Sequence, residues 1–479
     1  MVGVVGWVVL FGWCLRPIWG MDIFSHVAIG RLILSTGIPQ SDVLSAAHPE
    51  AVWSPFQVAY EVLVAWMDAR GGLDALRFVH AGLFATGLWL VARFVRRQTS
   101  TLGAAAALTA MCLLLFDERL RLRPHAVNLL LEAAVLLPVA AGGWRLAPRR
   151  WLWGLPVVAF CWASMHALGA LWLLAVLGTV AVAGENRESR RWGWTAFGLS
   201  ALGTSLAPGA IAGISTVFGS ASPWAAAYVP ELAPSWAWFG EGSLYGLLCG
   251  ALPWVALVSV VLAVKTRPER VRWSSIIAAA GLTFGALAMA RLGYYAAFAV
   301  ALCLPELRRL RPPPVVPILV AAFLSVVLLA HVAPRWEAAP PWTTTLQPDA
   351  FPEVEAATLK KAEVQARIFN RTEWGGYLLY VLHPGCTVLS DGRVIFSEDV
   401  GELLQWNEVP ERRGAAAEAA YDRYGVDLLV RRRADQGGGV FPEGGPWELL
   451  LRGPVADIWS RRGPVTEQRK QALGRVLSP

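Results

Sequence analysis

The stretch from Leu83 to Leu137, LFATGLWLVARFVRRQTSTLGAAAALTAMCLLLFDERLRLRPHAVNLLLEAAVLL, decides the fold of this chain. It consists of long apolar runs separated by short arginine-bearing segments, and a helix that spans a bilayer needs roughly 20 mostly apolar residues. Similar runs recur along the first two-thirds of the chain. The pattern predicts a polytopic α-helical membrane protein.

We expect about eleven transmembrane helices, near residues 2–19, 75–95, 101–116, 125–143, 151–165, 167–183, 193–207, 243–264, 274–290, 293–305 and 314–332. The composition agrees, because 55% of the 479 residues are hydrophobic and only 16% are charged, against about a quarter charged in soluble proteins. The first run lacks a basic leading segment and a small-residue cleavage site, which predicts a retained helix rather than a signal peptide.

Basic residues gather in alternate loops, and all of these loops fall on one side if every run crosses the bilayer. The positive-inside bias makes that side the cytoplasm of a bacterial inner membrane, with everything after about residue 333 outside. The formal net charge of +7 therefore has a membrane origin and does not indicate nucleic acid. The loop cations are Arg93, Arg96, Arg97, Arg145, Arg149, Arg150, Arg187, Arg190, Arg191, Lys265, Arg267, Arg270, Arg272, Arg308, Arg309 and Arg311.

The charge distribution also predicts the domain organisation. We expect a transmembrane domain over residues 1–333 that includes a long first periplasmic loop, 20–74. A stiff, proline-rich linker would follow over 334–352, and a small soluble α/β domain would occupy 353–479 on the periplasmic side.

Within the last domain, apolar runs bounded by turn residues predict strands near 386–390, 426–430 and 447–451. Helices are expected from Phe351 to about Phe369 and from Arg413 to Tyr424. The run 376–382 fits a helix or a buried strand equally well. Cys386 is the only cysteine in this domain, so no disulfide can form within it.

Two carboxylates in the first outer loop are candidates for catalysis. Asp22 begins a segment, 22–37, whose spacing predicts an amphipathic helix in the outer interface. A carboxylate just beyond the first crossing can act as general base on an acceptor hydroxyl, or hold a metal ion that does so. A capping role for Asp22 explains it equally well. Asp42 is the second candidate, although an ordinary turn would also account for it, and Glu61 is weaker.

The segment 117–125, DERLRLRPH, breaks the charge rule, since it is an outward loop that carries Arg119, Arg121 and Arg123. Guanidinium groups pair with phosphate oxygens in two-point fashion, which favours a site for a phosphate or diphosphate group. The alternative is contact with lipid headgroups, with Asp117 and Glu118 as local partners.

Further ionisable residues fall at the same outer end of the predicted bundle, namely His166, Glu231 and Arg291. Such groups are rare at membrane depth and mark substrate paths. Taken singly, His166 fits a hydrogen-bonded structural residue and Arg291 a side chain that snorkels outward. Their coincidence at one leaflet favours a substrate site.

Several short motifs resemble, in order, those of bacterial polytopic glycosyltransferase-like proteins of the GT-C superfamily. They are Asp22-Ile-Phe-Ser-His26, Gly37-Ile-Pro39 with Asp42, Arg123-Pro124-His125, Met165-His166 with Gly169, Arg367-Ile-Phe-Asn370, Trp374-Gly-Gly-Tyr-Leu378 and Asp391-Gly-Arg393. The resemblance spans nearly the whole chain. At two positions the sequence departs from the pattern, with Ser164 and Ala207 where that group has asparagine.

The resemblance implies transfer of a sugar from a polyprenyl-phosphate carrier to a glycan, lipid or protein acceptor at the periplasmic face, among membrane lipids. Asp22 would be the base and Asp42 the second carboxylate. Some members of the superfamily use a divalent metal ion, although no cluster in this sequence specifies one. The implied substrate-binding residues are His26, Arg121, Arg123, His125, His166, Glu231 and Arg291, with Asn370, Trp374, Asp391 and Arg393 in the last domain.

Two other functions remain open at this stage. A lipid-linked glycan transporter or flippase would also need charges within the membrane, but the sequence has no obvious inverted repeat. A non-catalytic scaffold for envelope glycan assembly would use the last domain to bind glycans. In that domain Asp391 and Arg393 would then contact a glycan, or pair with each other to fix their loop.

Overall fold

The structure is a computed structural model that describes residues 2–53, 57–99, 101–211, 214, 233–266, 272–307, 313, 315–391, 415–433 and 445–477. The chain forms two compact units. The first comprises Met1–Arg16, Pro55–Ala59 and Arg77–Thr343. The second comprises Pro17–Ser54, Tyr60–Leu76 and Thr344–Pro479, so most of the segment predicted as the first outer loop belongs to the same unit as the C-terminal segment.

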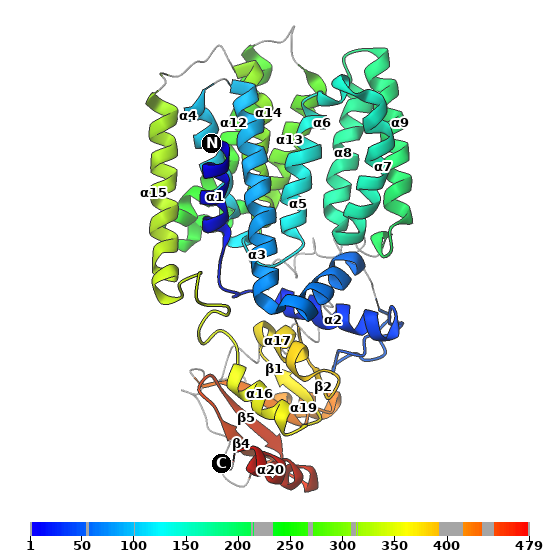
Figure 1. Cartoon of the computed structure of the whole chain (residues 1–479), viewed down its shortest axis with the longest axis vertical. Helices are drawn as coiled ribbons and strands as arrows, with labels where there is room; N and C mark the ends of the chain where they lie inside the picture. Colours follow the sequence, from blue (N-terminus) through cyan, green and yellow to red (C-terminus); the bar gives the residue numbers. More distant parts are fainter. Residues whose placement is uncertain are drawn as a thin grey trace. The chain divides into compact units, whose positions relative to one another are not determined.

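The first unit is a bundle of helices (Figure 1). Each of the eleven apolar runs is helical over most of its described length. Three described helices, α3, α12 and α15, are long and apolar enough to cross a membrane, and the number of crossings stays a prediction. Helix α3 Val58–Thr99 is shared, because its residues Tyr60–Leu76 belong to the second unit and those from Arg77 onward to the first. The other helices of the first unit are α1 Val2–Cys14, α4 Leu102–Phe116, α5 His125–Leu131, α6 Leu137–Ala140, α7 Pro148–Met165, α8 Ala167–Ala183, α9 Arg187–Leu206, α12 Leu244–Thr266, α13 Trp273–Ala288, α14 Tyr295–Leu307 and α15 Val315–Ala338.

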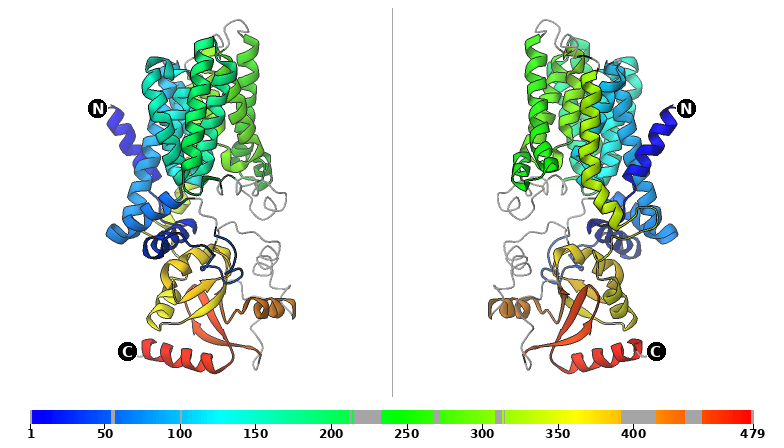
Figure 2. Two further views of the ribbon diagram at one scale, coloured as in Figure 1. Left: turned by 90° about the vertical axis from the view of Figure 1, so that its right-hand side faces the viewer. Right: turned by 90° about the vertical axis from the view of Figure 1, so that its left-hand side faces the viewer.

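Glycines allow α7, α8 and α9 to lie side by side, as Figure 1 and the left view of Figure 2 show. A Cβ atom on Gly193 of α9 would lie 2.5 Å from the backbone nitrogen of Ala181 in α8. One on Gly203 would lie 2.3 Å from the carbonyl oxygen of Pro156 in α7. Helices in a bilayer associate through such close contacts, because lipid tails are as apolar as the side chains they would replace.

The helix that begins at His125 is irregular two turns along. A π-helical turn, Glu132–Leu136, separates α5 from α6. Pro138 has no N–H to donate to the carbonyl of Ala134, so the regular ladder is interrupted here. A π turn absorbs one extra residue and frequently marks a functional position.

The second unit contains a five-stranded sheet with the strand order β2-β1-β3-β5-β4. β1 pairs in parallel with β2 and β3, whereas β5 runs antiparallel to β3 and β4. The strands are β1 Ala366–Asn370, β2 Cys386–Val388, β3 Leu428–Arg432, β4 Trp447–Arg452 and β5 Ala456–Arg461. The helices of this unit are α2 Asp22–Thr36, α16 Glu353–Lys361, α17 Thr372–Leu382, α19 Ala415–Tyr424 and α20 Pro464–Leu477.

The small α/β unit agrees with the predicted alternation of strands and helices, and three details differ from the prediction or complete it. The helix expected up to Phe369 ends at Lys361, because the chain turns at Glu363, which has a φ of +52°, and then enters β1. The ambiguous run 376–382 lies in helix α17. Strand β5 and helix α20 were not predicted, since charged residues interrupt the apolar pattern of both.

The first outer loop is built into this unit. Helix α2 confirms the helix predicted over 22–37 and ends before Gly37, whose φ is +84°. Its residue Phe24 is buried, with its ring 5.0 Å from that of Tyr377 in α17, so protein covers this apolar face. Further along, Val388 of β2 donates to the carbonyl of Leu44, and Ala46 donates to the carbonyl of Val388. The loop therefore extends the edge of the sheet beside β2.

Candidate functional site

Basic side chains from three connections of the first unit come together, and we call them the basic cluster: Arg119, Arg123, His125, His166 and Arg291. Arg119 and Arg123 lie on the loop after α4, and His125 begins α5. His166 lies between α7 and α8, and Arg291 lies in the turn between α13 and α14. The charges of the three arginines act on the ring of His125, and the ring of His166 lies beside it. Arg119, Arg123 and both histidines are buried.

The orientation of His166 follows from a chain of hydrogen bonds. Trp162 is a donor only, and its Nε1 donates to Oδ1 of Asn128 at 2.7 Å. The amide nitrogen of Asn128 therefore faces His166, whose Nδ1 lies 3.0 Å away and must accept. A neutral His166 then carries its proton on Nε2. Gly169 makes room for this chain, because a Cβ there would lie 1.9 Å from Nε1 of Trp162.

The basic cluster suits an anion. Guanidinium groups are always charged and present paired donors that match phosphate oxygens, and burial strengthens each such contact. The second histidine ring lies beside the first, with the centroids of His125 and His166 5.1 Å apart. Nδ1 of His125 is buried and has no hydrogen-bond partner among the described residues.

A second group of charged residues is centred on the same loop, which supplies three of its members. We call it the balanced cluster: Arg16, Asp117, Glu118, Arg121, His331 and Arg335. Here acids and bases pair with one another. Arg16 donates to Asp117 at 2.8 Å, and both are buried. Arg335 donates to Glu118 at 2.9 Å. Arg121 of the predicted site also lies here, with its Nη2 3.7 Å from Glu118.

The pairing explains the titration of Glu118. Burial alone would raise the pKa of this carboxyl, but the hydrogen bond with His331 and the charge of Arg335 outweigh it. Together they hold the pKa of Glu118 at about 2. The ring of His331 is itself fixed by stacking on Tyr245, with the centroids 3.7 Å apart.

The balanced cluster also contains a group of possible metal ligands. Asp117, Glu118 and His331 each offer an atom within 4.8 Å of the others. Each acid, however, is already paired with a guanidinium, Asp117 with Arg16 and Glu118 with Arg335. A divalent cation there would lie beside two fixed positive charges. The residues as arranged do not fit a resident divalent metal ion.

In the second unit Asp22 lies in the first turn of α2 and is partly buried. Met21 occupies the N-cap position of α2, and Asp22 is the first residue of the helix. One turn along the same helix, Nδ1 of His26 lies 3.6 Å from the buried carboxylate of Glu61. The ring of His26 also meets that of Tyr60 edge-on at 5.1 Å.

The start of α2 is held by the helix that carries the double glycine. A Cβ on Gly376 would lie 2.5 Å from the hydroxyl oxygen of Ser25 and 2.6 Å from the carbonyl oxygen of Met21. Ser25 also donates to the carbonyl of Asp391 at 2.9 Å. The position of Asp22 therefore depends on contacts that only a glycine at 376 permits.

The other predicted site residues have mainly backbone partners. Asp42 is buried in a turn, where its Oδ1 accepts from the N–H of Leu44 at 3.3 Å. Asn370 is buried and donates to the carbonyl of Ser390, and Trp374 donates to the carbonyl of Ala350. Asp391 is buried as well. Glu231 and Arg393 lie outside the described residues.

Sequence reasoning missed three residues that the structure associates with the site or its supports: Asn128, Glu132 and Trp162. Arg119 was named with the other arginines of its loop but was left out of the implied binding residues. Asn128 and Glu132 follow His125 at helical spacing, and polar residues inside an apolar run were the available signal. Trp162 carried no signal, since 24 tryptophans are present.

Comparisons with known proteins bear on the fold. No protein-family model matches the sequence, and neither does any curated protein. Among solved structures, the oligosaccharyltransferase AglB of Archaeoglobus fulgidus, in complex with an inhibitory peptide and a dolichol-phosphate, is 12% identical. The match covers 90% of this chain and 69% of that one, with a TM-score of 0.58. The apo form of the Archaeoglobus fulgidus enzyme is 11% identical over 90% and 69% of the two chains, with a TM-score of 0.55.

A third structure is ArnT from Cupriavidus metallidurans bound to undecaprenyl phosphate. It is 15% identical over 97% of this chain and 98% of its own, and its TM-score of 0.48 is too low to support an argument. These neighbours are polyprenyl-phosphate-dependent glycosyltransferases of the GT-C superfamily. At identities of 11–12%, the AglB matches establish a shared fold and leave the reaction to be argued from the residues.

Proposed function

Because the chain has the GT-C fold that its ordered motifs predicted, we propose that it is a membrane glycosyltransferase. It transfers a sugar from a polyprenyl-phosphate carrier to an acceptor at the periplasmic face of the inner membrane. The observation that carries this proposal is the basic cluster, a buried gathering of arginine and histidine side chains in a bundle of apolar helices. Ionisable groups at membrane depth are rare and often mark substrate paths.

The basic cluster binds the phosphate of the carrier. Arg119, Arg123 and Arg291 supply charge-assisted donors, and the Nε2–H of His166 adds a neutral one. As the bond between the sugar's anomeric carbon and the phosphate oxygen breaks, the electron pair stays with the phosphate. The leaving group gains charge, so donors aimed at it stabilise the transition state more than the ground state.

Asp22 acts as the general base. Its carboxylate takes the proton from an acceptor hydroxyl while that oxygen attacks the anomeric carbon. The new glycosidic bond forms, the carrier phosphate leaves, and Asp22 passes its proton to solvent. The helix that bears Asp22 is fixed by Ser25 and by the close contact with Gly376, which suits a group that must be positioned accurately.

The assignment to Asp22 rests partly on contrast with the other acids. Asp42 and Glu61 are buried, whereas Asp22 is only partly so and begins its helix. Asp42 is held in its turn by Leu44. The AglB structure with Zn and sulfate shows that a relative of the fold binds a metal ion. Since the acids of the balanced cluster are paired with arginines, no step here is assigned to a metal.

A transfer assay tests the proposal. The protein is reconstituted in nanodiscs with a labelled polyprenyl-phosphate sugar pool extracted from cells, and extraction of the labelled carrier followed by mass spectrometry reports sugar transfer. We expect Asp22→Asn to lower the rate about a thousandfold with normal binding of the carrier, because general-base catalysis contributes 10²–10⁴-fold. Asp42→Asn is the matched control and should lose far less.

Two outcomes would overturn the assignment. Full activity in Asp22→Asn removes this residue from the mechanism. If the wild-type protein instead moves intact carrier between leaflets of a vesicle without transferring sugar, the protein is a flippase.

A further inference from the structure

Glu132 is a fully buried carboxyl within the helical bundle that neither the mechanism nor the sequence analysis uses. It begins the π-helical turn after α5. One of its oxygens, Oε1, accepts hydrogen bonds from the hydroxyls of Tyr295 at 2.6 Å and Tyr294 at 3.2 Å. Its other oxygen has no hydrogen-bond partner among the described residues.

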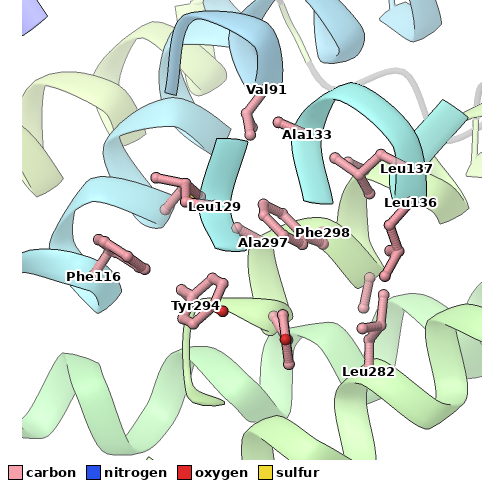
Figure 3. Close-up of a cluster of buried hydrophobic side chains, with 14 of the residues drawn as sticks. Val91, Phe116, Leu129, Ala133, Leu136, Leu137, Leu282, Tyr294, Ala297 and Phe298 are labelled. Atoms are coloured by element: carbon pink, nitrogen blue, oxygen red, sulfur yellow. The ribbon is translucent and has the colours of Figure 1, made fainter. Parts of the chain in front are cut away.

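The surroundings of Glu132 are apolar. Figure 3 shows the side chains of Leu129, Leu136 and Phe298 in the same region as Tyr294. Burying a carboxyl among such groups is unfavourable unless its hydrogen bonds compensate. The presence of a carboxyl at this apolar position indicates that its hydrogen bonds with the two tyrosines have a role in the protein.

The two partners of Glu132 connect parts of the basic cluster. Glu132 follows His125 by two turns on one continuous helical segment. Tyr294 and Tyr295 follow Arg291 by three and four residues, and only a short turn separates them from it. The hydrogen bonds of Glu132 therefore tie the helix that carries His125 to the turn that carries Arg291.

We propose that Glu132 is a positioning residue for the carrier site. By holding Tyr294 and Tyr295 it fixes the distance between His125 and Arg291 across the basic cluster, and so sets the affinity for the carrier phosphate. The π-helical turn is part of this device, because it allows the helix to pass Pro138 while Glu132 still points at the tyrosines. This inference rests on the proposed function.

Binding of undecaprenyl phosphate to the full-length protein in nanodiscs tests it. Glu132→Leu should weaken binding about tenfold, since the loss of a buried hydrogen bond of this kind corresponds to about that factor. Glu132→Gln keeps an amide oxygen for Tyr295 and should stay within about threefold of wild type. Tyr295→Phe should weaken binding alone, but add nothing in the Glu132→Leu background, because both changes remove the same contact.

The control is Thr283→Val, which removes a buried hydroxyl that bonds only within its own helix, to Ala279, among the described residues. It should leave carrier affinity unchanged. Turnover at saturating carrier should change little in Glu132→Leu, so the effect of this variant lies in KM rather than in kcat.

The outcomes separate this inference from the proposed function. If the wild-type protein shows no saturable binding of the carrier, the proposed function fails. If it binds and Glu132→Leu binds equally well, only the role of Glu132 fails. Equal loss in Glu132→Gln and Glu132→Leu would also overturn it, since the amide preserves the bond. Should Glu132→Leu not fold, Glu132→Gln and Tyr295→Phe still decide the question.

Discussion

The basic cluster and the balanced cluster each take residues from the loop after α4 but differ in electrostatic character. In the balanced cluster Asp117 pairs with Arg16, and Glu118 pairs with Arg335. In the basic cluster, cations surround the ring of His125. Arginines that alternate in the sequence are divided between the two, because Arg121 lies by Glu118 while Arg123 acts on His125.

The difference in pairing between the two clusters indicates different roles for their buried charges. Charges that compensate one another within the protein hold helices together, here α1, α15 and the loop after α4. Several basic side chains gathered within a bundle of apolar helices suit an anionic ligand such as a phosphate group. We therefore interpret the balanced cluster as structural and the basic cluster as substrate-binding.

The largest expected effect is on stability, in the balanced cluster. Asp117→Ala should lower the free energy of unfolding by about 3–5 kcal/mol, because it leaves Arg16 buried without its carboxylate. Denaturant titration of the purified protein in detergent measures this. The matched control is Arg145→Ala, whose pair with Glu185 is exposed and contributes less than about 1 kcal/mol. Similar free energies of unfolding for the two variants would mean that the pair of Arg16 and Asp117 contributes no more than an exposed pair.

The next effect is on the pH dependence of stability. The pKa of Glu118 is about 2 in the folded protein and 4.5 ordinarily, so its contribution is complete above about pH 4.5 and is lost as the pH falls toward 2. A shift of this size corresponds to about 3 kcal/mol. Thermal unfolding from pH 5 to 3 should show a decline that Glu118→Gln reduces. An identical decline in the variant would contradict the pairing with Arg335.

A smaller effect is expected on carrier affinity. Arg123→Gln should weaken binding of undecaprenyl phosphate about 10- to 100-fold, since hydrogen bonds to charged groups contribute about 1.5–3 kcal/mol. Arg121→Gln is the control from the other cluster and should change affinity less than about threefold. Equal losses in both variants would mean that the clusters do not differ in function.

The smallest expected effect concerns the orientation of His166. Asn128→Leu removes the donor to Nδ1, so either ring nitrogen can carry the proton. We expect kcat/KM for sugar transfer to fall about tenfold, the loss of one hydrogen bond to the leaving phosphate. Ser164→Ala is the control, since its hydroxyl donates to Phe160 within the same helix. An unchanged kcat/KM in Asn128→Leu, or an equal loss in Ser164→Ala, would contradict this role of Asn128.

Much of the fold was readable from the sequence, because apolar runs and basic loops encode it directly. Within the site, the motif around Arg123-Pro124-His125 led to the right loop, but alternation alone could not separate Arg119 from Arg121. The asparagine that contacts His166 comes from α5, at position 128, and not from position 164, where the motif places it. Such a contact depends on helix packing, which periodicity does not reveal.

The second unit shows the same limit. The motifs around Asp22 and Gly376 were each recognised, yet nothing in their sequence indicated that α2 and α17 pack together. The contact depends on the absence of a Cβ at 376, which only coordinates reveal. Strand β5 and helix α20 were concealed for a simpler reason. The charged Asp457 lies within a strand whose first five residues are buried, and α20 is largely polar.

The most direct test is an experimental structure of the full-length protein in nanodiscs with undecaprenyl phosphate. We expect the phosphate to be bound by Arg123, Arg291 and the Nε2 of His166. A phosphate bound instead beside Arg121 and Arg335, with the basic cluster unchanged, would contradict it.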